Sequence, residues 1–527
     1  MAGRYSILWE NERGVLTREE KDEGRRVITD LQLDRAFRLI CPDNMIREAF
    51  LSVLLTPLTE VGEIEKRRAV VGEFHRSPGL LDKLTELIRR LAVTKNSWDS
   101  ERSRLMASRR VDPKDKSLVL WVARENLVLT AHFVRIGLRI AADIHETLNM
   151  FGCTDGWLGQ LKEAARLVGC SVRSGEMTEL CDKLEKGLSN AHTYEIEFDF
   201  DDLLRITPTF LRDFQYVRVA EKPQKKPKNP LFSLFEKSEK TEKTKNSDAL
   251  PEMPEREVPL TGPEVGVEWG LELSAKAVQE LDRYLTSFLR TLFDRFSGLE
   301  EELYFYQAVN QHIDRLAERN VTTVFAELLP AEENRMEMEE LSDLLLLTES
   351  MSALSVIPND VSFGGGECGV SGMLITGKNN TGKTVYLRSV GTAVLLTQCG
   401  LPIPARSARI SVRNRIFTSF AKAEGELIPL SSAGRFEEEV AELSGIIERM
   451  EPDSLLLLNE TFQTTAYDEG AEGMYHILNY LARLECGFLF VTHLTKLREL
   501  YRGESGVTVK KTSDDPRTRY KIETIET

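Results

Sequence analysis

The residues best suited to chemistry in this 527-residue chain form the run Gly377-Lys-Asn-Asn-Thr-Gly-Lys-Thr384. The run matches the phosphate-binding loop G-x-x-x-x-G-K-[ST], in which backbone N–H groups and a helix N-terminus attract phosphate oxygens. Lys383 would reach the β- and γ-phosphates, and the hydroxyl of Thr384 would bind Mg²⁺. We therefore expect ATP and Mg²⁺ to be held by the loop and the residue after it: Gly377, Lys378, Asn379, Asn380, Thr381, Gly382, Lys383, Thr384 and Val385.

Three polar residues follow apolar runs further along the chain. Asn459 and Glu460 come directly after four leucines, Leu455 to Leu458, and His493 ends the run that begins at Cys486. Parallel strands that end at one sheet edge would bring these side chains beside the loop. We expect Glu460 to act as the catalytic general base and Asn459 to accept a hydrogen bond from Mg²⁺-bound water. His493 would contact the γ-phosphate or the attacking water, with a structural role at a strand end as the alternative.

Ser431, Ser432 and Gly434 lie between the loop and the leucine run, just before a predicted helix. Small hydroxyl residues at this position are typical helix caps. They would also suit phosphate binding from a neighbouring subunit, and sequence spacing does not distinguish the two roles.

The loop needs a strand before it and a helix after it, and the sequence supplies both. Met373 to Thr376 is short and apolar, as in a buried strand, and Val385 to Gln398 has helical spacing that Gly400 closes. From about Leu341 onward, short apolar strands alternate with helices. This alternation predicts a parallel α/β nucleotide-binding domain.

The region from about 15 to 190 is predicted to be helical, because apolar residues recur at spacings of three and four. The clearest helices are Leu31–Ile40, Met45–Leu55, Glu63–Glu73, Leu80–Leu91 and Leu118–Leu148. Two strands are predicted beyond them, at Tyr194–Phe200 and Phe214–Val219. The stretch from Leu271 to Glu318 predicts one very long, lever-like helix, with two helices broken at Gly298 as the alternative.

Residues 222–263 have the composition of a linker. Seven prolines interrupt a sequence rich in Lys, Glu, Ser and Thr, and eight lysines stand against three glutamates between Lys222 and Lys245. A flexible, solvated segment is the main interpretation. A weak, salt-sensitive contact with a nucleic-acid backbone is the alternative.

Composition limits the class of protein. Charged residues make up 29% of the chain, hydrophobic residues 41%, and the formal net charge is −15. Neither a signal-peptide core nor an apolar run of about 20 residues is present, so we expect a cytoplasmic protein without a membrane partner. The seven cysteines show no C-x-x-C pair or zinc spacing, which indicates reduced thiols.

Several motifs together carry a family resemblance: Gly377–Arg388, Cys399–Ala405, the Arg-Ile-Phe-Thr run at 415–418, Phe436 with Glu439, and Thr492-His493. They resemble the ATPase of the MutS DNA mismatch-repair family. The similarity is strong over 355–500 and looser over 30–150 and 265–320.

The resemblance implies a multidomain α plus α/β protein, in which a helical core and lever domain precedes a P-loop ATPase domain of the ABC (MutS-like) type. On this analogy residues 1–150 form the helical core with the first lever, and 151–262 a reduced clamp-like region that includes most of the 222–263 linker. Residues 263–350 form the return lever and core, and 351–527 the ATPase domain. The analogy also implies DNA as a partner and a homodimer. Its ATP sites would be completed in trans by Ser431, Ser432 and Gly434.

Departures from the family pattern sharpen these expectations. Asn459 replaces the usual aspartate and Arg435 a threonine, so slow hydrolysis is expected. The chain begins near the family's core, and its Phe325-Ala-Glu327 lies just before the ATPase, so direct mismatch reading is not expected. The alternative function is a nucleotide-switched protein scaffold with little hydrolysis. A transporter-type or chromosome-organising cassette protein is disfavoured because the chain has no LSGGQ-like stretch.

Overall fold

The computed structural model describes residues 4–10, 16–107, 116–188, 193–196, 214–217, 265–350, 352, 355–364, 372–421, 435–461, 467–501, 506–513 and 515–525. The chain divides into two compact units. The first contains Met1–Tyr5 and Asp82–Glu300, and the second contains Ser6–Leu81 and Glu301–Thr527. The predicted linker at 222–263 lies outside the described residues.

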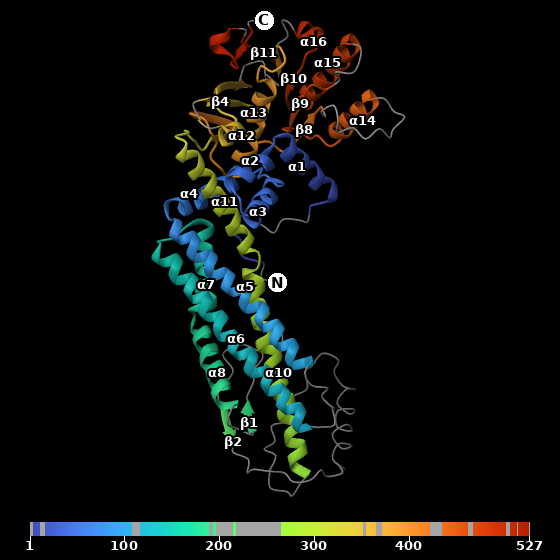
Figure 1. Ribbon diagram of the computed structural model, residues 1–527. Helices are drawn as coiled ribbons and strands as arrows, with labels where there is room; N and C mark the ends of the chain where they lie inside the picture. The colour runs from blue at the N-terminus through green and yellow to red at the C-terminus, as the bar shows by residue number, and fades with distance from the viewer. Residues whose placement is uncertain are drawn as a thin grey trace. The chain divides into compact units, whose positions relative to one another are not determined.

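Long helices build the first unit (Figure 1). They are α5 (Pro78–Ala107), which begins in the second unit, α6 (Lys116–Met150), α7 (Gly156–Gly169), α8 (Val172–Leu188) and α10 (Val265–Phe296). Helix α6 packs against α7, α8 and α10. Two short strands, β1 (Thr193–Ile196) and β2 (Phe214–Val217), pair antiparallel and confirm the two predicted strands within the described residues.

A buried polar cluster joins three helices of the first unit. Arg102 of α5 forms an ion pair with Asp282 of α10 at 2.7 Å and donates to the Thr130 hydroxyl of α6 at 2.9 Å. Thr130 in turn donates to Asp282 at 2.8 Å. Because each of these polar groups has a partner, the cluster fixes how the three helices align.

The helical part of the second unit confirms the predicted N-terminal helices. Its elements are α1 (Arg18–Asp30), α2 (Leu33–Ile40), α3 (Asn44–Leu54), α4 (Val61–Arg76) and α11 (Leu299–Glu318). Thr17 and Glu20 form a capping box that defines the start of α1. Stacked aromatic rings fill the core between α2, α3 and α11, where Phe50 contacts both Phe37 and Phe305.

The prediction of one helix from Leu271 to Glu318 is wrong, and the alternative is confirmed. Helix α10 ends at Phe296 and α11 begins at Leu299. Gly298 between them has φ of +92°, a left-handed conformation that glycine adopts without a steric cost and that a continuous helix cannot contain.

A six-stranded sheet forms the centre of the second unit. Its strands are β6 (Gly372–Thr376), β8 (Ile416–Phe420), β9 (Leu455–Asn459), β10 (Gly487–Val491), β11 (Val507–Thr512) and β12 (Ile522–Thr524). The order is β12-β11-β6-β10-β9-β8, and every pair is parallel except β11 with β12. This arrangement confirms the predicted α/β character.

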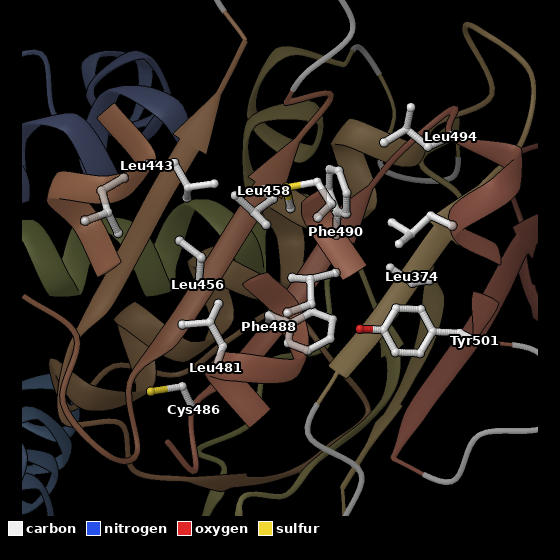
Figure 2. Close-up of a cluster of buried hydrophobic side chains, with 14 of the residues drawn as sticks. Leu374, Leu443, Leu456, Leu458, Leu481, Cys486, Phe488, Phe490, Leu494 and Tyr501 are labelled. Atoms are coloured by element: carbon white, nitrogen blue, oxygen red, sulfur yellow. The ribbon is translucent and has the colours of Figure 1, made fainter. Parts of the chain in front are cut away.

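Helices α13 (Lys383–Gln398), α14 (Arg435–Ile447), α15 (Tyr467–Arg483) and α16 (Thr495–Leu500) surround the sheet. Leu456, Leu458 and Phe488 pack with Leu443 and Leu481 in a buried cluster on the face covered by α14, α15 and α16 (Figure 2). Leu457 points to the opposite face, because strand side chains alternate, and there it meets α13 at Gly391. The four leucines are therefore buried on both faces, as their continuous apolar run indicates.

A second sheet was not predicted. Strands β3 (Glu327–Leu329), β4 (Met336–Leu341), β5 (Asn359–Phe363) and β7 (Ser407–Ser411) form it in the order β3-β7-β4-β5. The pattern Met-Glu-Met at 336–338 alternates buried and partly exposed residues and was the available signal. Helix α12 (Leu344–Glu349) and the 3-10 turns Ala331–Glu333 and Pro516–Thr518 also belong to the described part of the second unit. Among the described residues, no helix combines the length and the apolar character needed to cross a membrane.

Candidate functional site

The predicted loop connects β6 to α13, with Lys383 as the first helical residue. Gly377 has φ of +142°, and a Cβ placed there would lie 2.0 Å from the Thr512 hydroxyl oxygen. Gly382 has φ of +92° and borders the ring of Tyr520. Both positions therefore require glycine, one for space and both for backbone conformation. Lys378, Asn379 and Asn380 at the loop tip are exposed, whereas Thr384 and Val385 are half-buried.

Lys383 is 4% exposed, and its ammonium group turns back over the loop. Its Nζ donates to the carbonyl oxygens of Gly377 at 3.0 Å and Lys378 at 2.7 Å. Burial lowers the pKa of Lys383, and the nearby Glu460 carboxylate partly opposes this shift. A buried cation held by backbone carbonyls at a helix N-terminus suits an anionic ligand.

Thr384 lies beside the end of the central strand. Its hydroxyl donates to Asn459 Oδ1 at 2.9 Å. The structure thus brings together the two residues that were predicted to bind the metal. A hydroxyl and an amide oxygen are ligands that Mg²⁺ accepts in company with phosphate and water, so the pair fits this ion as a neutral site.

Glu460 and His493 meet across the same sheet edge. His493 Nε2 and Glu460 Oε1 are 3.0 Å apart, and both side chains are 28% exposed. Glu460 follows β9 with φ of +59°, and its N–H donates to the Val491 carbonyl at the end of β10. This left-handed residue turns the chain out of the strand and places the carboxylate beside the histidine that follows β10.

The proposed trans residues Ser431, Ser432 and Gly434 lie outside the described residues, so their prediction stays a prediction. Helix α14 begins directly after them at Arg435.

Sequence reasoning missed Tyr520. Its ring lies 3.4 Å from the position that a Cβ on Gly382 would occupy, and Arg519 stacks over it at 4.7 Å. Asn359 holds the segment in place by donating to the Tyr520 carbonyl at 3.1 Å and accepting from the Ile522 N–H at 2.8 Å. The sequence offered little signal for this contact, since Tyr520 lies 138 positions after Gly382 in a segment without a motif.

Comparison with known proteins identifies this part of the chain. The family model "MutS domain V" matches residues 373–524, from β6 to β12. This segment of the chain is thus similar to domain V of the MutS family.

Curated relatives carry the same family name. The chain is 29% identical over 258 residues to the DNA mismatch repair protein MutS of Clostridium kluyveri, covering 43% of this chain and 29% of that protein. It is 32% identical over 234 residues to the probable DNA mismatch repair protein Msh6 of Drosophila melanogaster, covering 43% and 19%. It is 35% identical over 150 residues to the DNA mismatch repair protein MSH3 of Kluyveromyces lactis, covering 28% and 14%. The matches thus span less than a third of each of these relatives.

The segment matched by the MutS domain V model contains the loop, Asn459, Glu460, His493 and Tyr520. The residues that meet at the sheet edge therefore all lie within the segment that the family model matches.

Proposed function

We propose that this MutS-like protein binds and hydrolyses ATP at the edge of the six-stranded sheet and acts as an ATP-gated, dimeric DNA clamp. One observation carries the proposal: the loop lysine, the Thr384–Asn459 pair and the Glu460–His493 pair converge at the carboxyl ends of adjacent strands. Ligands of parallel α/β sheets bind at this edge.

Each residue has a role in the proposal. The loop N–H groups and Lys383 hold the phosphates, and Lys383 exchanges its carbonyl partners for phosphate oxygens. Thr384 and Asn459 would hold Mg²⁺, which would neutralise charge on the phosphates. Glu460 is the general base that takes a proton from the attacking water.

His493 orients the Glu460 carboxylate through the 3.0 Å contact, as a donor from Nε2–H. Tyr520 offers an aromatic face beside Gly382, on which the nucleotide base would stack.

The dimeric arrangement is proposed from the family resemblance. Ser431, Ser432 and Gly434 would complete the partner's site by contacting its γ-phosphate. In the same scheme residues 1–150 and 263–350 form core and levers, 151–262 the clamp-like region, and 351–527 the ATPase domain.

We further propose that the chain does not read mismatches through Phe325-Ala-Glu327. Arg68 lies over the Phe325 ring at 5.6 Å, and Glu327 begins β3, where it pairs with Arg409 at 2.9 Å. Both side chains therefore contact arginines within the second unit.

A nucleotide-switched protein scaffold is the second candidate. It is favoured by the neutral Asn459, which contributes no charge toward Mg²⁺, and by the net charge of −15, which opposes general DNA binding. In this case ATP would bind and change the protein's partners with little turnover.

The deciding experiment is steady-state ATP hydrolysis with and without duplex, mismatched and branched DNA. The clamp proposal predicts hydrolysis that DNA stimulates at least about threefold and that Lys383→Ala and Glu460→Ala abolish. If the protein binds ATP but none of the three DNAs changes its rate of hydrolysis, the result would favour the protein scaffold over the DNA clamp. A protein that binds no nucleotide would contradict both.

A further inference from the structure

Helix α1 contacts three separate parts of the ATPase half of the second unit. It packs against β8, where Arg415 lies 3.8 Å from Glu20 (Figure 1). It also forms ion pairs with α14, and its C-terminal end reaches α13.

Ion pairs connect α1 with α14. Arg26 pairs with Glu442 on α14, and Arg449, just after α14, pairs with Glu23 at 3.0 Å and Glu19 at 3.1 Å. The side chains of Arg26 and Glu442 are only 30% and 32% exposed, and Glu23 is 15% exposed. Such partly desolvated pairs interact more strongly than fully exposed ones.

The contrast with the solvent face of α1 shows that these pairs are specific. Arg18 and Arg25 are 96% and 70% exposed, and each pairs with Asp22 of the same helix. Pairs of this kind within one helix contribute little to position. The arginine that reaches another element is the partly buried Arg26.

The other end of α1 is joined to the helix that follows the loop. Gln32, directly after α1, has φ of +56°, and its side-chain oxygen accepts from Arg388 of α13 at 2.7 Å. Arg388 also pairs with Asp343 at 3.4 Å. At Gly391 of α13, Leu31 approaches so closely that a Cβ would lie 2.7 Å from it.

We propose that α1 is a strut that couples the nucleotide-binding helix α13 to α14, the helix that directly follows the predicted trans residues. Arg26 and Arg449 are the positioning residues of this strut. The proposal rests on the proposed function for its consequence: nucleotide bound by the loop of one subunit would set the position of the trans residues offered to the partner's site.

The mechanics follow from the contacts. A helix of 13 residues is about 20 Å long and nearly rigid over that length. Motion of α13 at Arg388 and Gly391 therefore moves α1, and the ion pairs carry the motion to α14.

Hydrogen–deuterium exchange tests the coupling peptide by peptide. The probe is AMP-PNP with Mg²⁺, and the variant is Arg26→Gln/Arg449→Gln, which removes both links. The matched control is Arg18→Gln/Arg25→Gln, which removes the same charge from the exposed face. Arg26→Lys/Arg449→Lys keeps the charges.

In the wild-type protein we expect AMP-PNP to slow exchange at least about threefold both at 377–386 and at 435–447. The double glutamine variant keeps the effect at 377–386 and loses it at 435–447, whereas the control and the lysine variant keep both. Unchanged nucleotide protection of 435–447 in the glutamine variant would overturn the proposal. Loss of this protection in the Arg18→Gln/Arg25→Gln control would also overturn it, because the effect would then come from the loss of positive charge on α1 and not from the ion pairs with α14.

Failure of this inference can be told apart from failure of the proposed function, because the exchange rates are also measured without nucleotide. If AMP-PNP changes nothing at 377–386 in the wild-type protein, the proposed function fails. The strut is then judged by exchange of the free proteins: the glutamine variant must speed exchange at 435–447 at least about threefold over the control. Equal rates would exclude α1 as the support of α14.

Discussion

Asn459 gives the candidate metal site its unusual character. The amide oxygen accepts from Thr384 at 2.9 Å, so the geometry of a metal pair is present without a negative charge. A carboxylate at the same place would attract Mg²⁺ directly.

We therefore predict that Asn459→Asp lowers the Mg²⁺ concentration needed for half-maximal hydrolysis by about tenfold and raises turnover. A magnesium titration of ATPase activity measures both. Asn479→Asp, which makes the same change on α15 where Asn479 accepts from Tyr501, is the control and should leave the titration unchanged. An unshifted magnesium midpoint in Asn459→Asp would show that this residue lies outside the metal's reach.

Glu302 is a titrating group away from the site. Its carboxylate accepts from the Ile7 N–H at 2.8 Å. Desolvation raises its pKa to about 7, although the hydrogen bonds from Ile7 and Ser6 and the charge of Arg67 oppose the shift. Between about pH 4.5 and 7 the folded state therefore holds a proton that the unfolded chain releases. Stability contributed by the group falls as pH rises through this window.

Glu302→Gln should flatten that dependence, so that wild-type protein loses about 2 kcal/mol more unfolding free energy than the variant between pH 5 and 8. Urea unfolding at the two pH values measures the difference. Glu301→Gln alters the exposed neighbour and should behave as wild type. Parallel pH profiles for wild type and Glu302→Gln would contradict the raised pKa.

At the site, sequence reasoning predicted which residues gather but not how they touch. The motif and the apolar strands placed Lys383, Asn459 and His493 at one edge, and the structure places them there. The contact of Glu460 with His493 depends on the left-handed backbone of Glu460, which no local pattern announces. Tyr520 was missed for a similar reason, because its approach to Gly382 depends on tertiary packing.

At the scale of elements, the packing of helix α13 depends on the close approach of two leucine side chains to Gly391. A Cβ on Gly391 would lie 2.4 Å from Leu457 and 2.7 Å from Leu31, and both leucines are buried. Cores as densely packed as this one resist even a single added methyl group.

Gly391→Ala should therefore destabilise the protein by about 1–3 kcal/mol. Gly473 in α15 has nothing within 4 Å of the position of a Cβ. Gly473→Ala should instead stabilise by about 0.5–1 kcal/mol, since alanine loses less backbone entropy in a helix. Thermal unfolding of the two variants measures both changes in stability. A Gly391→Ala protein as stable as wild type would refute the packing argument.

Elements with strong local patterns were the predictable ones. The helices at 31–55 and 118–148 and the leucine strand follow from periodicity, and the structure confirms them. The second sheet was missed because β3, β4, β5 and β7 are short and come from distant parts of the sequence. The apolar spacing alone could not distinguish one continuous helix from two helices that are broken at Gly298.

For the whole molecule, sequence order hides how the second unit is assembled. Near the N-terminus, Ile7 forms hydrogen bonds with Glu302 and Tyr306, which lie about 300 positions away in the sequence. Arg67 adds a bond to the Leu8 carbonyl at 2.7 Å, and its guanidinium lies over Trp9 at 4.3 Å. Hydrophobic periodicity reports local structure only, so it could not predict that residues 6–81 complete the unit that holds the six-stranded sheet.

The central claim for the molecule is that this sheet edge binds ATP and that Glu460 hydrolyses it. The most direct measurement is parallel ATP binding and single-turnover hydrolysis for wild type, Lys383→Ala and Glu460→Gln. We predict that Glu460→Gln binds ATP within about threefold of wild type and hydrolyses it at least about 100-fold more slowly, whereas Lys383→Ala loses binding. Wild-type hydrolysis by Glu460→Gln would contradict the assignment.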